Sequence, residues 1–341
     1  MNKNSRRLSL SLLLLAVFII AAATLRTVAC IIDLEDNLIY FESNALITAS
    51  GIVAVIGATL AIAFGAAMHK ESLRASFSTS GTYVPSGVLA AALALLSLVL
   101  LATYSVLSAL DPTPSTLITA NLTLIAALLA PLSIAHLFLT AFLTERHTRL
   151  RAWFSLATVA FLAIYASFVY FGSASPLNSH NKIMEEMAYL FAAIFFLYES
   201  RISLGREMWR SYIAFGMLAA LISSYASIPA IIVYLVRGEL IFSSFESAIF
   251  LLATSVFVSS RLTLLVRASQ DGISKEMAVL AEFAAKRQDA LDRPAIEDGT
   301  QISIEELIVM DPEHDSEENN SEITITEPLE ESGTQESIDE A

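Results

Sequence analysis

The sequence predicts an all-α protein, a polytopic transmembrane helix bundle, and three observations lead to that class. Of the 341 residues, 55% are hydrophobic, whereas soluble domains contain about 45–50% apolar residues even when glycine is included. The hydrophobic residues are concentrated in long runs. These runs are long enough to cross a bilayer as helices, which takes about 20 residues each. Most of the charged residues lie between the runs or after the last one.

The net charge of −14 belongs mainly to the C-terminal end of the chain. Residues 294–341 contain sixteen Asp and Glu and neither Lys nor Arg. Nucleic acid is therefore not an expected partner, because phosphate binding requires a basic surface. The single cysteine, Cys30, excludes an internal disulfide and a cysteine-based metal cluster.

Eight spans are expected, each an apolar run bounded by polar residues. They cover residues 8–25, 45–68, 85–110, 117–143, 152–171, 183–200, 211–236 and 244–265. In the second span, Gly57, Ala61 and Gly65 recur at four-residue intervals, and such a stripe of small residues lets another helix approach closely. A cleaved signal peptide is the alternative for the first run, because basic residues precede it and Thr27-Val-Ala-Cys30 weakly resembles a cleavage site.

The distribution of basic residues predicts that both termini lie in the cytoplasm. With eight spans and an inside N-terminus, seventeen Lys and Arg fall on inner segments or inner span ends. Only Arg26, Lys182 and Arg237 fall outside. Basic residues accumulate on the cytoplasmic side of membrane proteins, so this count places both termini in the cytoplasm. The protein is expected to be a multi-pass protein of the plasma (cell) membrane, surrounded by the lipid bilayer.

Two segments follow the predicted bundle of residues 1–268. Residues 269–293 are expected to form a cytoplasmic amphipathic helix, since apolar residues from Ile273 to Leu291 recur at three- and four-residue steps before Pro294. Residues 294–341 are acidic and poor in aromatic residues, which is typical of a disordered tail. A cytoplasmic protein partner is therefore expected to bind within residues 274–341.

The sixth predicted span contains three carboxylates. One helical stripe of this span reads Glu185, Tyr189, Ala192, Phe196 and Glu199. A carboxylate-lined face could bind a cation or relay protons, because charge inside a membrane is costly unless it has a function. We favour a structural interpretation, in which Glu185 and Glu186 occupy the first turns, where the helix dipole favours negative charge. Glu199 is then expected at the inner interface beside Arg201.

Two further ionisable residues fall within predicted spans, Glu246 and His136. Ser243-Ser-Phe-Glu246 is a capping-box pattern, so Ser243 is expected to cap the eighth span while Glu246 reaches back to it at the outer surface. His136 is expected to be neutral and bonded to a serine or a backbone carbonyl. The alternative for His136 is a proton relay, for which Glu199, at a similar depth, is the possible partner.

The seventh span is the best candidate for a binding pocket. It places Ser223, Ser224, Tyr225 and Ser227 near the middle of the membrane and ahead of Pro229. Because proline has no N–H group, Pro229 leaves the carbonyl of Tyr225 without its helical donor. Binding helices of transporters expose backbone in this way. Packing between helices and a kink explain the same residues equally well.

The motifs of common enzyme classes are absent from the sequence. H-E-x-x-H, a P-loop and G-x-S-x-G do not occur, and no cofactor or metal site is expected. The expected function is a non-catalytic membrane sensor or scaffold that engages a cytoplasmic partner through the C-terminal helix and acidic tail. The alternative is a transporter of a small solute or cation, with its pocket on the kinked seventh span. An intramembrane enzyme is a third and less favoured class.

Overall fold

The structure is a computed structural model that describes residues 3–34, 41, 43–67, 84–110, 117–142, 148–171, 179–204 and 208–265. These residues form eight helices. The labelled ones are α1 (Lys3–Ile32), α2 (Asn44–Ala66), α4 (Val84–Leu110), α5 (Leu117–Phe142), α6 (Thr148–Phe171), α7 (His180–Ser203) and α8 (Trp209–Arg237). The last helix, Phe245–Leu265, follows α8. The described residues contain no strand, only an isolated antiparallel bridge between Leu34 and Phe41.

Six of the described helices are long and apolar enough to cross a membrane: α1, α2, α4, α6, α8 and the last helix. The apolar stretch of α5 is shorter, Leu124–Thr140, and α7 does not reach the same hydropathy because it carries charged residues near both ends. The protein is therefore an all-helical bundle of the membrane type, as the sequence predicts.

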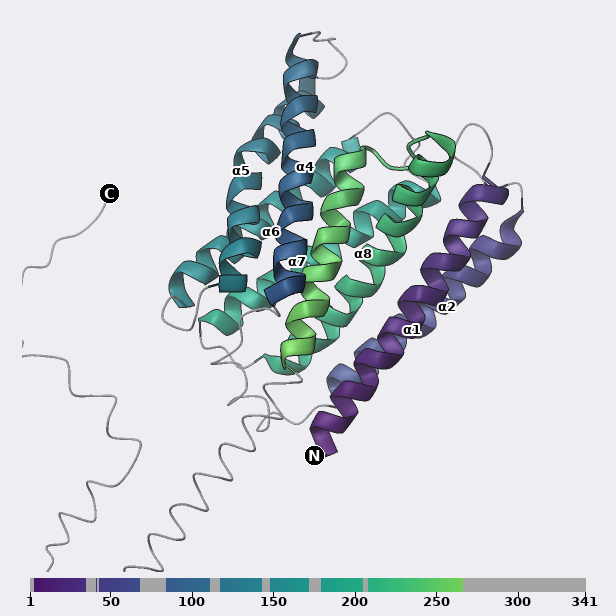
Figure 1. The fold of residues 1–341 in the computed structure, drawn as a ribbon, viewed down its shortest axis with the longest axis vertical. Coiled ribbons are helices and arrows are strands. Elements are labelled where there is room, and N and C mark those ends of the chain that lie inside the picture. Colours follow the sequence, from purple (N-terminus) through teal and green to yellow (C-terminus); the bar gives the residue numbers. More distant parts are fainter. Residues whose placement is uncertain are drawn as a thin grey trace, which may run out of the picture. The chain divides into compact units, whose positions relative to one another are not determined.

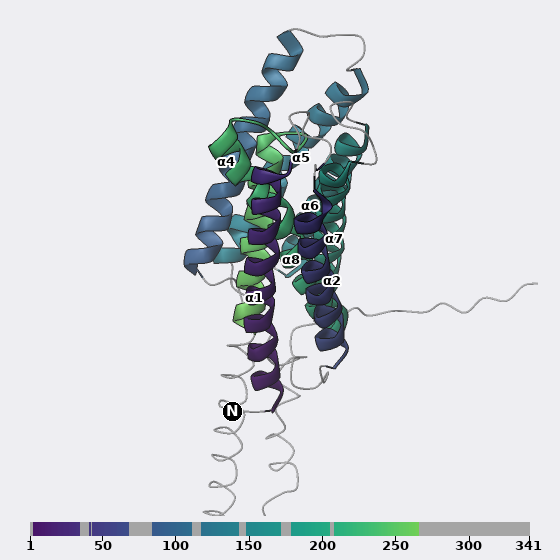
Figure 2. The ribbon, with the colours of Figure 1, turned by 90° about the vertical axis from the view of Figure 1, so that its right-hand side faces the viewer.

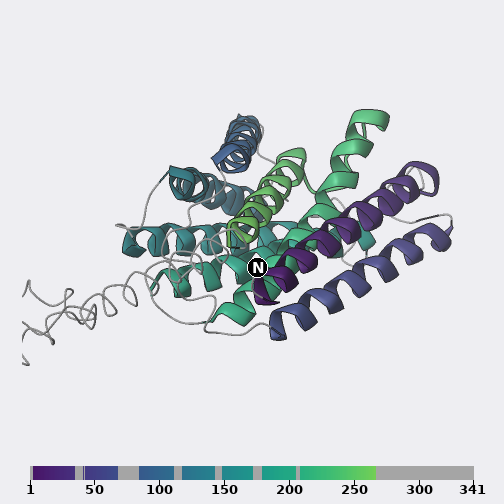
Figure 3. The same cartoon turned by 60° about the horizontal axis from the view of Figure 1, so that its bottom comes forward.

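The helices pack as two sets that meet at α7 and α8 (Figure 1). In the first set, α1 and α2 pack on each other and on α8. Figure 2 shows these two helices side by side. In the second set, α4 packs on α5, α5 on α6 and α6 on α7. The contact of α7 with α8 joins the sets, and Figure 3 shows the last helix between α4 and α1.

The last helix is the centre of the bundle, and most of its side chains are buried. It contacts every helix from α4 to α8, through the pairs Ser86–Ser260, His136–Phe257, Phe161–Phe250, Glu199–Arg261 and Ser224–Ser255. Polar and aromatic groups on this helix are therefore enclosed by protein.

The small-residue stripe of α2 is a site of close helix packing, which confirms that prediction. A Cβ atom added at Gly57 would lie 3.1 Å from both Leu221 of α8 and Phe18 of α1. At Gly65 it would lie only 2.6 Å from the Cβ atom of Ala214 on α8. Larger residues at these two positions would push α2 away from its neighbours.

The helix bounds lie close to the predicted runs, with two differences that affect the candidate site. α1 continues to Ile32, so that Arg26, predicted to follow the first span, lies inside this helix and is fully buried. α7 begins at His180 and ends at Ser203, which places Glu185 in its second turn. The predicted C-terminal segments, residues 269–293 and 294–341, lie outside the described residues.

Candidate functional site

α7 carries the predicted stripe, and every side chain in it is buried: Glu185, Tyr189, Ala192, Phe196 and Glu199. The two carboxylates stand fourteen residues apart in the sequence. At 1.5 Å per residue, this separation is about 21 Å along the helix. Each carboxylate therefore belongs to its own polar cluster, one near each end of α7.

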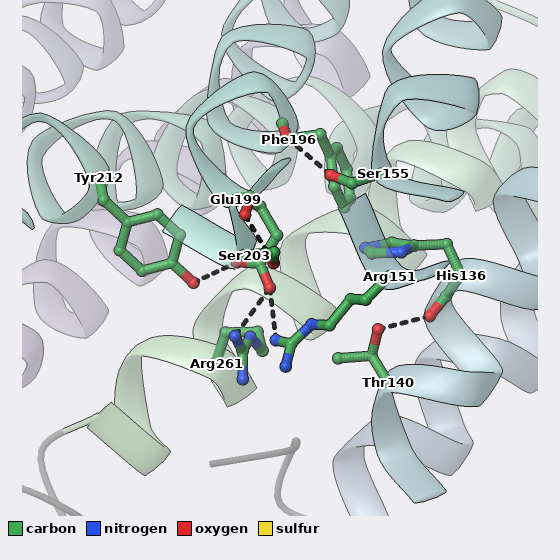
Figure 4. Close-up of polar contacts among 9 residues, drawn as sticks. All are labelled: His136, Thr140, Arg151, Ser155, Phe196, Glu199, Ser203, Tyr212 and Arg261. Carbon is green, nitrogen blue, oxygen red and sulfur yellow. Dashed lines mark hydrogen bonds and ion pairs between the residues drawn. The ribbon is translucent and has the colours of Figure 1, made fainter. Parts of the chain in front are cut away.

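The Glu199 cluster consists of Glu199, Arg151, Arg261 and Tyr212 (Figure 4). Glu199 Oε1 accepts from Arg151 Nη2 at 2.6 Å and from Arg261 Nη2 at 2.7 Å. Its Oε2 atom accepts from the Tyr212 hydroxyl at 2.6 Å. The side chains of Glu199 and Arg261 are fully buried. One carboxylate thus joins α6, α7, α8 and the last helix.

The predicted neighbour of Glu199, Arg201, is not its partner: Glu199 pairs with Arg151 and Arg261 instead. Arg201 is exposed, and its guanidinium donates to Met208 Sδ at 3.8 Å. The partners that sequence reasoning missed, Arg151 and Arg261, lie 48 and 62 residues from Glu199. One signal could have found Arg261: it is a basic residue inside the eighth predicted run, where a charge needs a partner.

His136 lies beside the Glu199 cluster (Figure 4), and its predicted hydrogen bond is not formed among the described residues. Neither ring nitrogen has a hydrogen-bond partner within the described part of the chain, so the expected serine or carbonyl partner is wrong. Its ring packs against Phe196, with 5.5 Å between ring centroids, and against Phe257 at 5.8 Å. His136 is therefore enclosed between aromatic rings of α7 and the last helix.

Near the beginning of α7, serine groups hold Glu185. The Ser243 N–H donates to Glu185 Oε2 at 2.9 Å and the Ser243 hydroxyl to Oε1 at 2.5 Å. The Ser247 hydroxyl also donates to Oε1 and lies 2.6 Å from the Tyr189 hydroxyl. These three donors, two hydroxyls and one backbone amide, hold Glu185 more directly than the predicted effect of the helix dipole. Glu186, the next residue, is partly exposed.

The predicted capping box at Glu246 is wrong by one residue. The last helix begins at Phe245, and the hydroxyl of Ser244, not Ser243, accepts from the Ser247 N–H at 3.3 Å. Ser243 is engaged by Glu185 instead. Glu246 is buried rather than at the surface, and it accepts from the Tyr165 hydroxyl at 3.4 Å.

The Arg26 cluster consists of Arg26, Asn181, Tyr225 and Ser50. Arg26 Nη1 donates to the Tyr225 carbonyl at 3.3 Å, so the carbonyl that Pro229 leaves without a helical donor is bonded from α1. Arg26 Nη2 donates to Asn181 Oδ1 at 3.0 Å. The guanidinium lies 4.6 Å from the centroid of the Tyr225 ring, and the Tyr225 hydroxyl lies 2.9 Å from Ser50 Oγ.

The five candidate pocket residues are all buried, but they do not converge on one hollow. Tyr225 bonds toward α1 and α2, whereas Ser224 lies 2.5 Å from Ser255 of the last helix. The hydroxyls of Ser223 and Ser227 have no hydrogen-bond partner among the described residues. Pro229 leaves the Tyr225 carbonyl without a helical donor, and Arg26 bonds that carbonyl instead.

A groove on the outside of α2 adjoins the Arg26 cluster. It has a volume of about 560 Å³ and is open on one side. We call it the α2 groove; its walls include Ile47, Gly51, Ile52, Val55 and His180. His180 precedes Asn181 in the chain, so this end of the groove lies next to the Arg26 cluster. Its Nε2 atom is buried and has no hydrogen-bond partner among the described residues.

No protein-family model, curated protein or solved structure matches this chain. Within the described ranges, no group of three or more His, Cys, Asp or Glu could hold a metal ion. The features of the structure that bear on function are the Glu199 cluster, the Arg26 cluster and the helices that they join.

Proposed function

We propose that the protein is a non-catalytic membrane sensor or scaffold that engages a cytoplasmic protein partner through residues 274–341. In this proposal the chain crosses the plasma membrane eight times and both termini are cytoplasmic. The ratio of seventeen inner to three outer basic residues supports that orientation. Although α7 is the least apolar helix, it fits as a span because its two buried glutamates face protein rather than lipid.

The single observation that supports a sensor is the Glu199 cluster. Arg261 belongs to the last helix and lies four residues before Leu265, where the described part of this helix ends. The chain continues from there into the segment proposed to bind the partner. A buried ion-pair network has discrete arrangements, intact or broken, and a signal requires such a two-state element. A ligand that favours one arrangement would thereby shift the start of the C-terminal segment.

Deletion of residues 294–341 tests the partner-binding part of the proposal. The full-length and shortened proteins are purified from cross-linked cells, and the proteins recovered with each are compared. We expect at least one specific partner to be lost with the deletion. An unchanged set of partners would remove the argument for a scaffold.

A substitution that removes the charge of Glu199 but keeps the shape of its side chain tests the sensor part. Glu199→Gln in the full-length protein should change the recovery of that partner, because it breaks the network that joins the last helix to α6 and α7. Arg201→Gln, at an exposed position of the same helix, is the matched control and should leave recovery unchanged. Equal recovery with both variants, each confirmed as folded, would contradict coupling through the cluster.

A transporter of a small solute or cation is the second candidate. It is favoured by the buried hydroxyls of Ser223 and Ser227, which lie one helical turn apart and lack partners among the described residues. Flux into proteoliposomes should fall in Ser223→Ala and Ser227→Ala but not in Ser211→Ala, a partly exposed position of α8. Unaltered flux in the first two variants would exclude this pocket.

A further inference from the structure

Arg26 is a fully buried cation whose hydrogen-bond partners among the described residues are neutral. Within the described part of the chain it bonds to the Tyr225 carbonyl and the Asn181 amide oxygen, and it lies over the Tyr225 ring. No carboxylate of the described residues forms an ion pair with it. A buried charge without a counter-charge is unfavourable in a protein and more so in a membrane. An anion bound next to Arg26 would remove that cost.

Two buried N–H groups at this position have no acceptor among the described residues. They are Arg26 Nε and Asn181 Nδ2, on side chains that are 0% and 2% exposed. The Nε–H of a guanidinium and a neighbouring Nη–H form a planar fork that matches two oxygens of a phosphate or carboxylate. Asn181 is also the second residue of α7, where the helix dipole favours an anion. Unused donors beside an uncompensated cation indicate an anion site.

The α2 groove provides an apolar surface beside this site. Ile52 and Val55, both more than half exposed, line it at the outer face of α2. Ile47, another wall residue, accepts at its carbonyl from Ser50 of the Arg26 cluster at 2.8 Å. His180, which precedes Asn181 in the chain, forms the end of the groove that lies next to the Arg26 cluster. A groove that is open on one side, apolar along Ile52 and Val55, and adjacent at one end to the buried Arg26 cluster is complementary to an acyl chain that carries an anionic headgroup.

We propose that the Arg26 cluster and the α2 groove together bind an anionic membrane lipid. Arg26 and Asn181 bind the phosphate of the headgroup, and the acyl chain lies along Ile47, Ile52 and Val55. This inference concerns binding alone and does not depend on the proposed function.

The test uses the full-length protein, purified in neutral detergent. Binding is measured by native mass spectrometry and by the lipid-induced rise in melting temperature, with phosphatidylglycerol, phosphatidylcholine and chain-free glycerol phosphate as probes. We expect phosphatidylglycerol to bind at least about tenfold more tightly than phosphatidylcholine, a ratio of affinities equal to about 1.4 kcal/mol. Arg26→Gln should reduce that preference to about one, whereas the exposed Arg201→Gln control should retain it.

Gly51→Leu tests the groove without touching the cation. An added Cβ atom at Gly51 meets no atom within 4 Å, so the variant should fold while its side chain occupies the groove. We expect it to lose phosphatidylglycerol binding. Full lipid binding by the Gly51→Leu variant would overturn the proposal, whether or not the separate Arg26→Gln variant folds. Glycerol phosphate that binds as tightly as the lipid would also overturn it, and would assign the cluster to a free phosphate.

Discussion

The arginine clusters near the two ends of α7 contain the same kind of side chain in opposite electrostatic situations. In the Glu199 cluster, one carboxylate accepts from both Arg151 and Arg261. In the Arg26 cluster, the guanidinium has an amide, a carbonyl and an aromatic ring as partners, all neutral. The first arrangement contains its own carboxylate and joins four helices. The second has no carboxylate partner among the residues that the structure describes, which is why we assign it to binding rather than to structure.

Among the variants that test this contrast, Glu199→Gln is expected to lose the most unfolding free energy. The variant leaves the fully buried Arg261 and the partly buried Arg151 without their carboxylate, and breaking a buried ion pair from one side costs about 3–5 kcal/mol. We expect a loss of unfolding free energy of that size, measured by denaturant titration in detergent. The matched control is Glu239→Gln. The Glu239 side chain is 39% exposed and pairs with Arg237 at 3.0 Å, and exposed pairs contribute about 0–1 kcal/mol. Similar losses in the two variants would contradict a structural role for the Glu199 cluster.

Much of the fold follows from local properties of the sequence. Apolar runs of sufficient length mark each helix, and the stripe of Gly57 and Gly65 marks where α2 approaches its neighbours. The stripe from Glu185 to Glu199 was also identified, because its members share one face of a single helix. Properties of this kind are visible in a few consecutive turns.

The partners in the candidate site depend on tertiary contacts, and these could not be predicted. Arg26 bonds to Tyr225 across 199 residues, and Arg261 bonds to Glu199 across 62. Sequence reasoning located the free carbonyl of Tyr225 because proline chemistry is local, but not the arginine that donates to it. The capping box failed for the same reason: Ser243 is held by Glu185, and Ser244 takes over the cap.

A smaller effect is expected from paired glycine substitutions at the two ends of α2. Gly65 lies at the end that packs on Ala214 and on the Arg210 carbonyl, where a Cβ atom would come within 2.6 and 2.9 Å. Gly65→Ala should therefore cost about 1–3 kcal/mol, as overpacking does. Gly51 lies at the open end, beside the groove, and Gly51→Ala should stabilise the helix by about 0.5–1 kcal/mol. Melting temperatures of the two variants should move in opposite directions, and shifts of the same sign would contradict the difference in packing.

The smallest effect expected is the difference between two tyrosine hydroxyls, one in each cluster. The Tyr212 hydroxyl donates to the charged Glu199 at 2.6 Å, and a hydrogen bond to a charged group contributes about 1.5–3 kcal/mol. Among the described residues, the Tyr225 hydroxyl bonds to Ser50, which still donates to the Ile47 carbonyl when that hydroxyl is removed. Tyr225→Phe should thus cost about 0.5–1.5 kcal/mol, and it retains the ring beneath Arg26. In the same denaturant titration, Tyr212→Phe should be less stable than Tyr225→Phe by about 1 kcal/mol. Only Tyr212→Phe removes a hydrogen bond to a charged group. The reverse order would mean that Tyr225 supports Arg26 through its hydroxyl, and that the Arg26 cluster is structural as well.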